Sequence, residues 1–105
     1  MPFTTDGKSA RLDTFSGFTI TVCQLRPHSR GTVHIRSADP AQPPRIVPNY
    51  LCHPIDERVI VDGIRMARQL ATSAPMRPLV KRIIRPDDGS DAQLLDFARN
   101  HGRTV

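Results

Sequence analysis

Proline is the residue that most constrains how this chain can fold. Ten prolines stand among 105 residues, about twice the ordinary usage of ~5%. Because proline fixes φ and lacks an amide proton, each one interrupts a helix interior or a central strand. Four of them fall between Ala38 and Asn49, which predicts an extended connector there. The prolines also exclude a long coiled coil, and no solenoid repeat is visible.

The length and composition predict a single folded domain. About a quarter of the residues are Leu, Ile, Val or Phe, above the roughly 20% that marks disordered chains. No apolar run approaches the roughly 18 residues of a membrane span, and the first 17 residues lack the apolar core of a secretory signal. We therefore expect a cytoplasmic protein without a membrane span. Cys23 and Cys52 are too few for a disulfide scaffold and are expected to be reduced thiols.

The charge balance is basic, with 15 Lys and Arg against 10 Asp and Glu and a net charge of +5. A nucleic-acid partner is not expected, because the cations are scattered with acids between them and the chain has one Tyr and no Trp for base stacking. The favoured interpretation is a basic surface that faces solvent or a partner.

The first half of the chain predicts an antiparallel hairpin. Residues 1–17 are polar and are expected to form a flexible lead-in. Phe18–Leu25 and Thr32–Ser37 both alternate apolar with polar residues, the pattern of half-buried strands. Arg26–Gly31 lies between them and contains Pro and Gly, which favour a turn.

The second half predicts two amphipathic helices. The first extends over Pro54–Thr72, with Asp56 and Glu57 near its positive end and Arg65 and Arg68 toward its negative end.

The second helix follows a short basic segment. Val80–Arg85 reads as an edge strand, and Pro86 begins the turn after it. Ser90 and Gln93 fit a capping box, and Gly102 is placed to end the helix.

The order of these elements predicts an α+β fold, an antiparallel sheet with two amphipathic helices. Each expected core residue lies on the apolar side of its element. The set is Phe18, Ile20, Val22, Val33, Ile35, Ile60, Ile64, Ala67, Leu70, Leu94 and Phe97.

The sequence offers no self-sufficient active site. Its six glycines never stand closer than ten residues apart, so neither a dinucleotide loop nor a P-loop can be written. No GxSxG or HExxH motif is present. No catalytic, cofactor-binding or metal-binding residue is therefore assigned.

The histidines have ordinary structural interpretations. His28 lies in the turn, His34 on the polar face of a strand and His53 just before a helix-starting proline. His101 is placed to bind the last carbonyls of the second helix. Cys52 and His53 are not expected to act as nucleophile and base, because adjacent residues rarely orient in that way.

Four motifs carry a resemblance to a known family. They are P-x-S-R-G-x-V from Pro27, S-x-D-P from Ser37, P-x-I-x-P-N-Y-L from Pro44 and S-D-x-x-L-x-D-F from Ser90. With the run Gly17–Ile35 and the helix over Arg58–Ala71, this order resembles the C-terminal, substrate-binding part of the glucose-methanol-choline (GMC) oxidoreductases, in the choline and alcohol dehydrogenase branch.

The resemblance implies a partial GMC substrate-binding domain over residues 18–105. Family members bind FAD on a separate domain and oxidise a small alcohol by hydride transfer to the flavin. The family's base histidine lies in an H-P-x-G-T-C motif that this chain does not contain. His101 is followed by Gly102 and Arg103, so the role is not carried onto it.

The matching residues are interpreted as scaffold. Ser29-Arg30-Gly31 is expected to shape the hairpin connection, with Gly31 supplying a backbone angle that other residues resist. Asp39-Pro40 is expected to form a turn, and Asn49-Tyr50 to anchor the proline-rich connector.

Two functions follow from this sequence. The leading hypothesis is a fragment of an FAD-dependent GMC oxidoreductase, inactive alone because the FAD-binding domain and the histidine motif are missing. The alternative is a non-catalytic interaction module that binds an acidic partner through its arginines.

A fragment should be marginally stable. Buried area contributes about 25 cal/mol per Å², which must offset roughly 1–2 kcal/mol of backbone entropy per residue. We expect broad thermal unfolding and a tendency to aggregate, measured by calorimetry at several concentrations. A sharp, reversible, concentration-independent melt above roughly 60 °C would instead favour the self-sufficient module.

Overall fold

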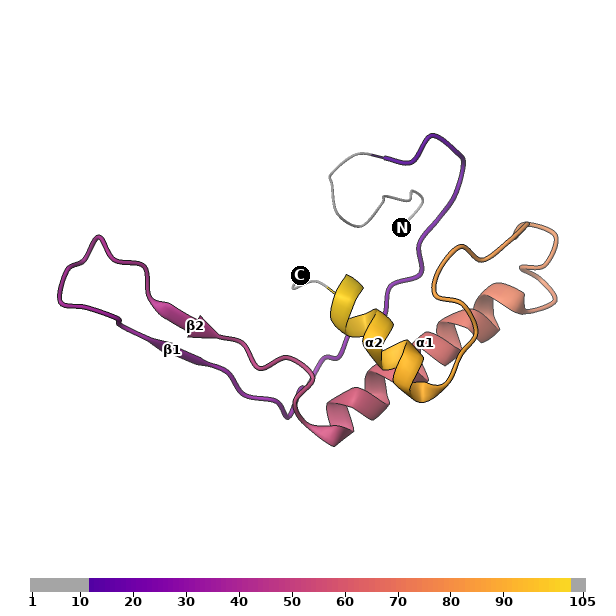
Figure 1. The fold of residues 1–105 in the computed structure, drawn as a ribbon. Coiled ribbons are helices and arrows are strands. Elements are labelled where there is room, and N and C mark those ends of the chain that lie inside the picture. Colours follow the sequence, from indigo (N-terminus) through magenta and orange to yellow (C-terminus); the bar gives the residue numbers. More distant parts are fainter. Residues whose placement is uncertain (1–11, 103–105) are drawn as a thin grey trace.

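The chain is an α+β structure in which a helix pair carries a projecting two-stranded hairpin (Figure 1). The computed structural model describes residues 12–102. Its elements are β1 (Thr32–His34), β2 (Arg45–Val47), α1 (Pro54–Thr72) and α2 (Asp91–His101). The α+β class is confirmed. Most of the expected lead-in, residues 1–17, lies outside the described residues.

Helix α1 has the bounds that its sequence predicts. His53 is the N-cap, where its Nδ1 accepts a hydrogen bond from the Ile55 amide at 3.2 Å. Pro54 follows at the position where its missing amide proton costs nothing. The helix ends at Thr72, and the amide of Ser73 donates to the carbonyl of Leu70.

Helix α2 is defined by caps at both ends. Ser90 Oγ accepts from the Gln93 amide, while Gln93 Oε1 accepts from the Ser90 amide at 2.8 Å, so the expected capping box is present. The Gly102 amide donates to Ala98 at the other end. His101 Nδ1 lies 3.0 Å from the Phe97 carbonyl oxygen, and its ring stacks on Phe97, which confirms its expected role.

The apolar core lies between the two helices, which contact each other (Figure 1). Val61, Ile64 and Leu94 form the buried cluster, and Leu94 is 1% exposed. The partly buried residues around it are Ile60, Leu95, Phe97 and Ala98. This cluster is small, so polar contacts supply much of what holds the remaining segments in place.

Two arginines of α1 tie the helix to the start of α2 and to the loop before it. Arg65 pairs with Asp91 at 2.6 Å, and Arg68 donates to the carbonyl of Pro86. The expected dipole role for both arginines is wrong, because the last turn of α1 holds no basic residue. Both arginines lie one turn or more before the end of α1, and their side chains extend toward Asp91 and Pro86 instead of the last carbonyls.

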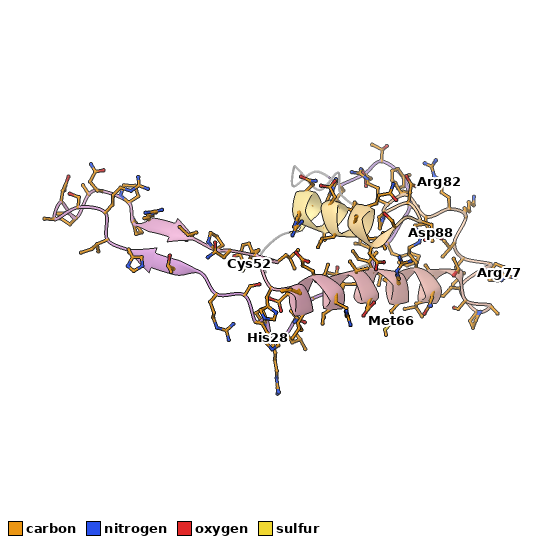
Figure 2. The ribbon with its side chains drawn as sticks, turned by 60° about the horizontal axis from the view of Figure 1, so that its bottom comes forward. His28, Cys52, Met66, Arg77, Arg82 and Asp88 are labelled. Atoms are coloured by element: carbon orange, nitrogen blue, oxygen red, sulfur yellow. The ribbon has the colours of Figure 1, made fainter. Side chains whose placement is uncertain are left out.

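The hairpin pairs different segments from those predicted. β1 pairs antiparallel with β2, with Val33 opposite Ile46 and His34 opposite Arg45. The expected pairing of Phe18–Leu25 with Thr32–Ser37 is therefore wrong. The connector does contain a strand, because Pro44 and Pro48 flank β2 rather than fall inside it. In Figure 2 the hairpin extends away from both helices.

The segment Phe18–Leu25 lies against α1 and has no strand partner within residues 12–102. A Cβ at Gly63 would collide with Cγ1 of Val22, so the absence of a side chain in mid-helix lets the segment approach closely. Further along, Gln24 Nε2 donates to Asp56 at 3.2 Å. Helix α1 takes the place that the sequence pattern assigns to a neighbouring strand.

The expected edge strand Val80–Arg85 is also wrong. The segment is irregular and follows a series of tight turns, in which the amides of Met76 and Arg77 donate to the Ser73 carbonyl. No strand among residues 12–102 lies beside it, and an extended segment without a ladder partner does not become a strand.

The expected core set is partly correct. Ile64 and Leu94 are buried, and Ile20, Val22, Ile60, Ala67 and Phe97 are partly buried. Four expected core residues are exposed instead: Phe18, Val33, Ile35 and Leu70. Val33 and Ile35 are exposed because the hairpin leaves the helix pair, so their face meets no layer.

The contact between Gly63 and Val22 can be tested by the sign of the change in unfolding free energy that Gly63→Ala causes. Gly63→Ala in an ordinary helix interior would stabilise by about 1 kcal/mol. Here we expect net destabilisation by about 1 kcal/mol, because overpacking costs ~1–3 kcal/mol. Urea unfolding gives the measurement.

Val22→Ala supplies the matched background. The double variant Val22→Ala/Gly63→Ala should be at least as stable as Val22→Ala alone, because the colliding methyl group is gone. A single Gly63→Ala variant more stable than the natural chain would contradict the close approach.

Candidate functional site

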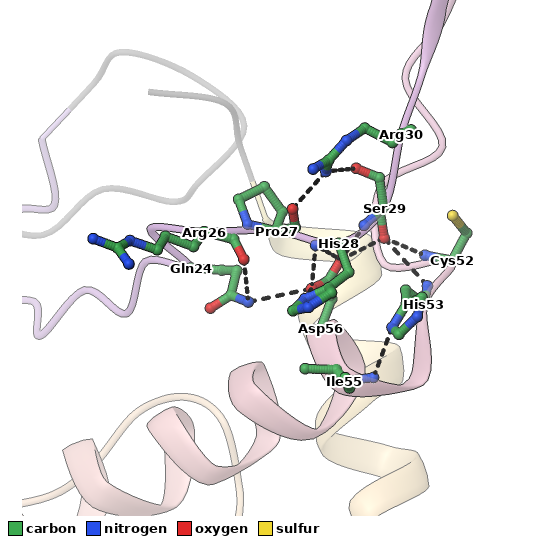
Figure 3. A network of polar contacts seen from close by, with 10 residues as sticks. All are labelled: Gln24, Arg26, Pro27, His28, Ser29, Arg30, Cys52, His53, Ile55 and Asp56. Atoms are coloured by element: carbon green, nitrogen blue, oxygen red, sulfur yellow. Dashed lines mark hydrogen bonds and ion pairs between the residues drawn. The ribbon is translucent and has the colours of Figure 1, made fainter.

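Asp56 is the centre of the main polar network, although it lies in the first turn of α1 and is only 1% exposed. Its Oδ1 accepts from the His28 amide at 2.9 Å. Its Oδ2 accepts from the Ser29 amide at 2.7 Å and from the Ser29 hydroxyl at 2.5 Å. Figure 3 shows the carboxylate enclosed by the segment 24–29. One side chain thus binds two consecutive backbone amides of a segment that precedes it by 27 residues or more.

Ser29 links this carboxylate to the start of the helix. While its hydroxyl donates to Asp56, its Oγ also accepts from the amides of Cys52 and His53, at 3.1 and 3.2 Å. These donors stand at the beginning of α1, where amides lack partners within the helix. The serine hydroxyl therefore satisfies both the carboxylate and the helix entry.

The network holds Asp56 in its ionised form. Hydrogen bonds from the His28 amide and the Ser29 hydroxyl place its pKa well below the usual range, against the opposing effect of burial. A carboxylate that accepts several amide hydrogen bonds is stabilised as the anion. Asp56 is therefore a fixed negative charge, unsuited to proton transfer near neutral pH.

The two histidines beside the carboxylate act as packing and capping groups. The rings of His28 and His53 stack with centroids 5.0 Å apart, and His28 Nδ1 lies 3.7 Å from Asp56 Oδ1. His53 Nδ1 accepts the hydrogen bond of the Ile55 amide at the start of α1, so this ring nitrogen is engaged in capping the helix. These contacts agree with a structural role for both residues, and the absence of a catalytic role stays a prediction.

The remaining candidate residues lie apart from this network or carry no reactive geometry. His34 is in β1 and is exposed. Cys23 and Cys52 are both exposed and unpaired. Within residues 12–102 no three His, Cys, Asp or Glu side chains are grouped so that they could hold a metal ion.

The base of the hairpin is closed by residues that the sequence interpreted as scaffold. Asn49 Nδ2 donates to the Arg30 carbonyl at 3.0 Å, across the two arms. A Cβ on Gly31 would lie 2.5 Å from the Val47 carbonyl oxygen. Gly31 is thus required for close approach of two backbones, and the expectation of a special backbone angle is wrong. Asn49 and Leu51 have a positive φ instead, of 51° each.

The expected turn at Asp39-Pro40 is present near the tip. The Gln42 amide donates to the Asp39 carbonyl at 3.1 Å, and the Ala41 amide donates to Asp39 Oδ1 at 3.0 Å. This Asx turn reverses the chain between β1 and β2.

These residues do not fit a flavin. A dinucleotide is held by a glycine-rich loop whose amides and helix N-terminus face the pyrophosphate. Here the start of α1 is occupied by Ser29 and His53, and the start of α2 by its capping box. The space beside Gly31 and the space beside Gly63 are occupied by neighbouring parts of the chain. The described part of the chain therefore contains no helix start open to a phosphate group.

Comparison with known proteins gives these scaffold residues a family. Residues 27–105, about three quarters of the chain, match the family model for GMC oxidoreductase, in its C-terminal part. The chain belongs to the GMC oxidoreductase family. The match begins at Pro27, immediately before the two residues whose amides Asp56 binds, so the network joins the first matched residues to α1.

Several curated GMC oxidoreductases are similar to the chain. The oxygen-dependent choline dehydrogenase of Pseudomonas aeruginosa (strain LESB58) is 38% identical over 91 residues, 85% of this chain and 16% of that protein. The alcohol dehydrogenase [acceptor] of Pseudomonas putida is 34% identical over the same shares. The glucose dehydrogenase [FAD, quinone] of Drosophila melanogaster is 44% identical over 59 residues, 56% of this chain and 9% of that protein.

The chain thus spans about one sixth of the length of the first two relatives. No solved structure matches it. Among the helices of residues 12–102, none combines the length and the apolar character needed to cross a bilayer.

Asp56 is the functional residue that sequence reasoning missed. The helix dipole is enough to explain an acidic residue in the first turn. It does not predict that the side chain of Asp56 is buried. The signal that was available is the motif P-x-S-R-G-x-V, whose serine is the partner of the carboxylate. A polar motif that precedes an acidic helix start is compatible with such a contact but does not require it.

The lowered pKa of Asp56 predicts how stability depends on pH. Because the pKa is lower in the folded chain, the carboxylate contributes stability fully above its unfolded pKa of about 4, and this contribution is lost as the pH falls below that value. Asp56→Asn should lower the thermal midpoint at neutral pH by roughly 5–10 °C. It should also flatten the acid side of the profile.

Thermal melts between about pH 7 and pH 3 measure both effects. Asp87→Asn is the matched control, because Asp87 is exposed in the loop before α2, and it should keep the slope of the natural chain. Equal profiles for the natural chain and Asp56→Asn would refute the anchoring role.

Proposed function

We propose that the chain forms part of the substrate-binding region of an FAD-dependent GMC oxidoreductase that oxidises a small alcohol. The observation that carries this proposal is the identity of 38% over 91 residues with a choline dehydrogenase. The name of the Drosophila glucose dehydrogenase relative includes FAD, which supports the cofactor. In such a reaction the alcohol gives a hydride to the flavin and its hydroxyl proton to a base.

This chain's own contribution is architectural. No described residue is assigned to hydride or proton transfer, and Asp56, the buried carboxylate, is committed as an anion to backbone amides. Its residues shape and position a surface, while an FAD-binding domain elsewhere in the parent enzyme supplies the cofactor. The isolated chain is then inactive.

The extent of exposed surface supports a covering domain. The accessible surface is 8735 Å², whereas a compact protein of this mass has about 5,900 Å². The radius of gyration is 17.3 Å, against roughly 13 Å for a compact domain of this length. A chain that packs within a larger enzyme would have such a shape.

The hairpin is the element best placed to meet the FAD-binding domain. Val33 and Ile46 lie directly opposite each other in the ladder and are 66% and 61% exposed. Ile35, two residues beyond Val33, is 89% exposed and prolongs the same apolar face. An isolated two-stranded hairpin is only marginally stable in water. Packing of another layer on this apolar face would stabilise it.

A cytoplasmic location is part of the same proposal. Both cysteines are exposed and unpaired, which is the usual state of thiols in a reducing compartment.

The first test uses the purified chain. We expect no flavin absorption band and no oxidation of choline or primary alcohols with an artificial electron acceptor, because no helix start is open to the pyrophosphate. Near-stoichiometric flavin bound to the isolated chain would contradict this expectation.

The second test transplants the chain into a complete enzyme. The 91 matched residues of the Pseudomonas choline dehydrogenase are replaced by those of this chain, and flavin content and turnover are measured. We expect the chimera to retain flavin and alcohol oxidation. A matched chimera with Asp56→Asn should lose activity in parallel with its folded fraction. A folded chimera that binds flavin but oxidises no alcohol would count against the proposal.

A further inference from the structure

The cations are scattered over the whole chain, but one stretch holds several of them without a carboxylate, and the GMC assignment leaves this stretch unexplained. From Gly63 to Pro86 the sequence holds six cations and no carboxylate. Two of these cations, Arg65 and Arg68, are paired with Asp91 and Asp88. The other four are Arg77, Lys81, Arg82 and Arg85, and all are exposed. Within residues 12–102 none of the four has an ion-pair partner.

A hollow lies among these cations, at the C-terminal end of α1. It is an open depression with a volume of about 450 Å³. Ala71, Val80 and Ile83 contribute its apolar part, and Arg77, Lys81 and Arg82 its charged part. Figure 2 places Arg77 and Arg82 at the end of the molecule opposite the hairpin. Thr72 completes the lining, and we call these seven residues the basic hollow.

The composition of the basic hollow selects its ligand. Three cations with no lining carboxylate attract negative charge, while the apolar side chains reward burial of a hydrophobic group. A nucleic acid fits poorly, because the hollow contains no aromatic residue on which a base could stack. A peptide segment that places a hydrophobic side chain among carboxylates satisfies both requirements.

We propose that the basic hollow docks an acidic segment of a partner protein, with an apolar side chain of that segment against Val80 and Ile83. This surface lies at the other end of α1 from the network around Asp56. It is also separate from the hairpin face assigned to the FAD-binding domain. The inference therefore stands independently of the alcohol oxidation proposed above.

The test measures binding of a fluorescein-labelled acidic peptide with leucines spaced among glutamates, by anisotropy, to the complete 105-residue chain. We expect saturable binding that weakens as salt rises. Lys81→Glu/Arg82→Glu should weaken it by about tenfold or more, because each reversal converts attraction to repulsion. Lys81→Gln/Arg82→Gln should weaken it less, and circular dichroism checks that both variants keep their helices.

The matched control reverses two exposed arginines outside the hollow, Arg36→Glu/Arg58→Glu, which gives the same change in net charge. This control should alter affinity less than about twofold. Equal weakening by both double reversals would overturn the site in favour of general attraction. Undiminished binding of the same peptide with serine in place of leucine would overturn the apolar component. Tighter binding of single-stranded oligothymidylate, lost in Lys81→Glu/Arg82→Glu, would overturn the choice of partner.

Discussion

The buried carboxylate of Asp56 is the constraint on which the arrangement of this chain depends. It fixes two consecutive amides of the segment 24–29 and the hydroxyl of Ser29, and that hydroxyl in turn holds the amides that open α1. Removing a charge of this kind from water is costly unless it is fully hydrogen-bonded. The surrounding backbone therefore has one favourable placement, which sets where the hairpin leaves the helix pair.

The two parts of the structure are stabilised differently. The helix pair shares the cluster of Val61, Ile64 and Leu94 and is reinforced by ion pairs such as Arg99 with Glu57 at 2.6 Å. These ion pairs are partly exposed and add little individually. The hairpin has ladder hydrogen bonds but no buried apolar side chain. Burial against another layer is therefore the contribution that it lacks.

Both helices were predictable from sequence because their determinants are local. Pro54 and the capping box of Ser90 and Gln93 act within one helical turn, and the apolar periodicity marks the buried side. The strands were not predictable, because alternation shows that a segment can pair but not with what. Phe18–Leu25 has the pattern of a strand, yet it lies on α1 because Gly63 leaves room for Val22. The contacts of Asp56 were not predictable for the same reason, because its partners precede it by 27 residues or more.

The closed base of the hairpin makes the arm a lever. The link from Asn49 to Arg30 and the tight approach of Gly31 to Val47 fasten both strands where they leave the helix pair. Beyond that point neither strand contacts α1 or α2, so any rotation at the base is magnified toward the turn at Asp39. Small repacking around Ser29 would thus translate into large displacements at the tip. The rigidity of the polar network around Asp56 therefore determines how precisely the tip of the hairpin is positioned.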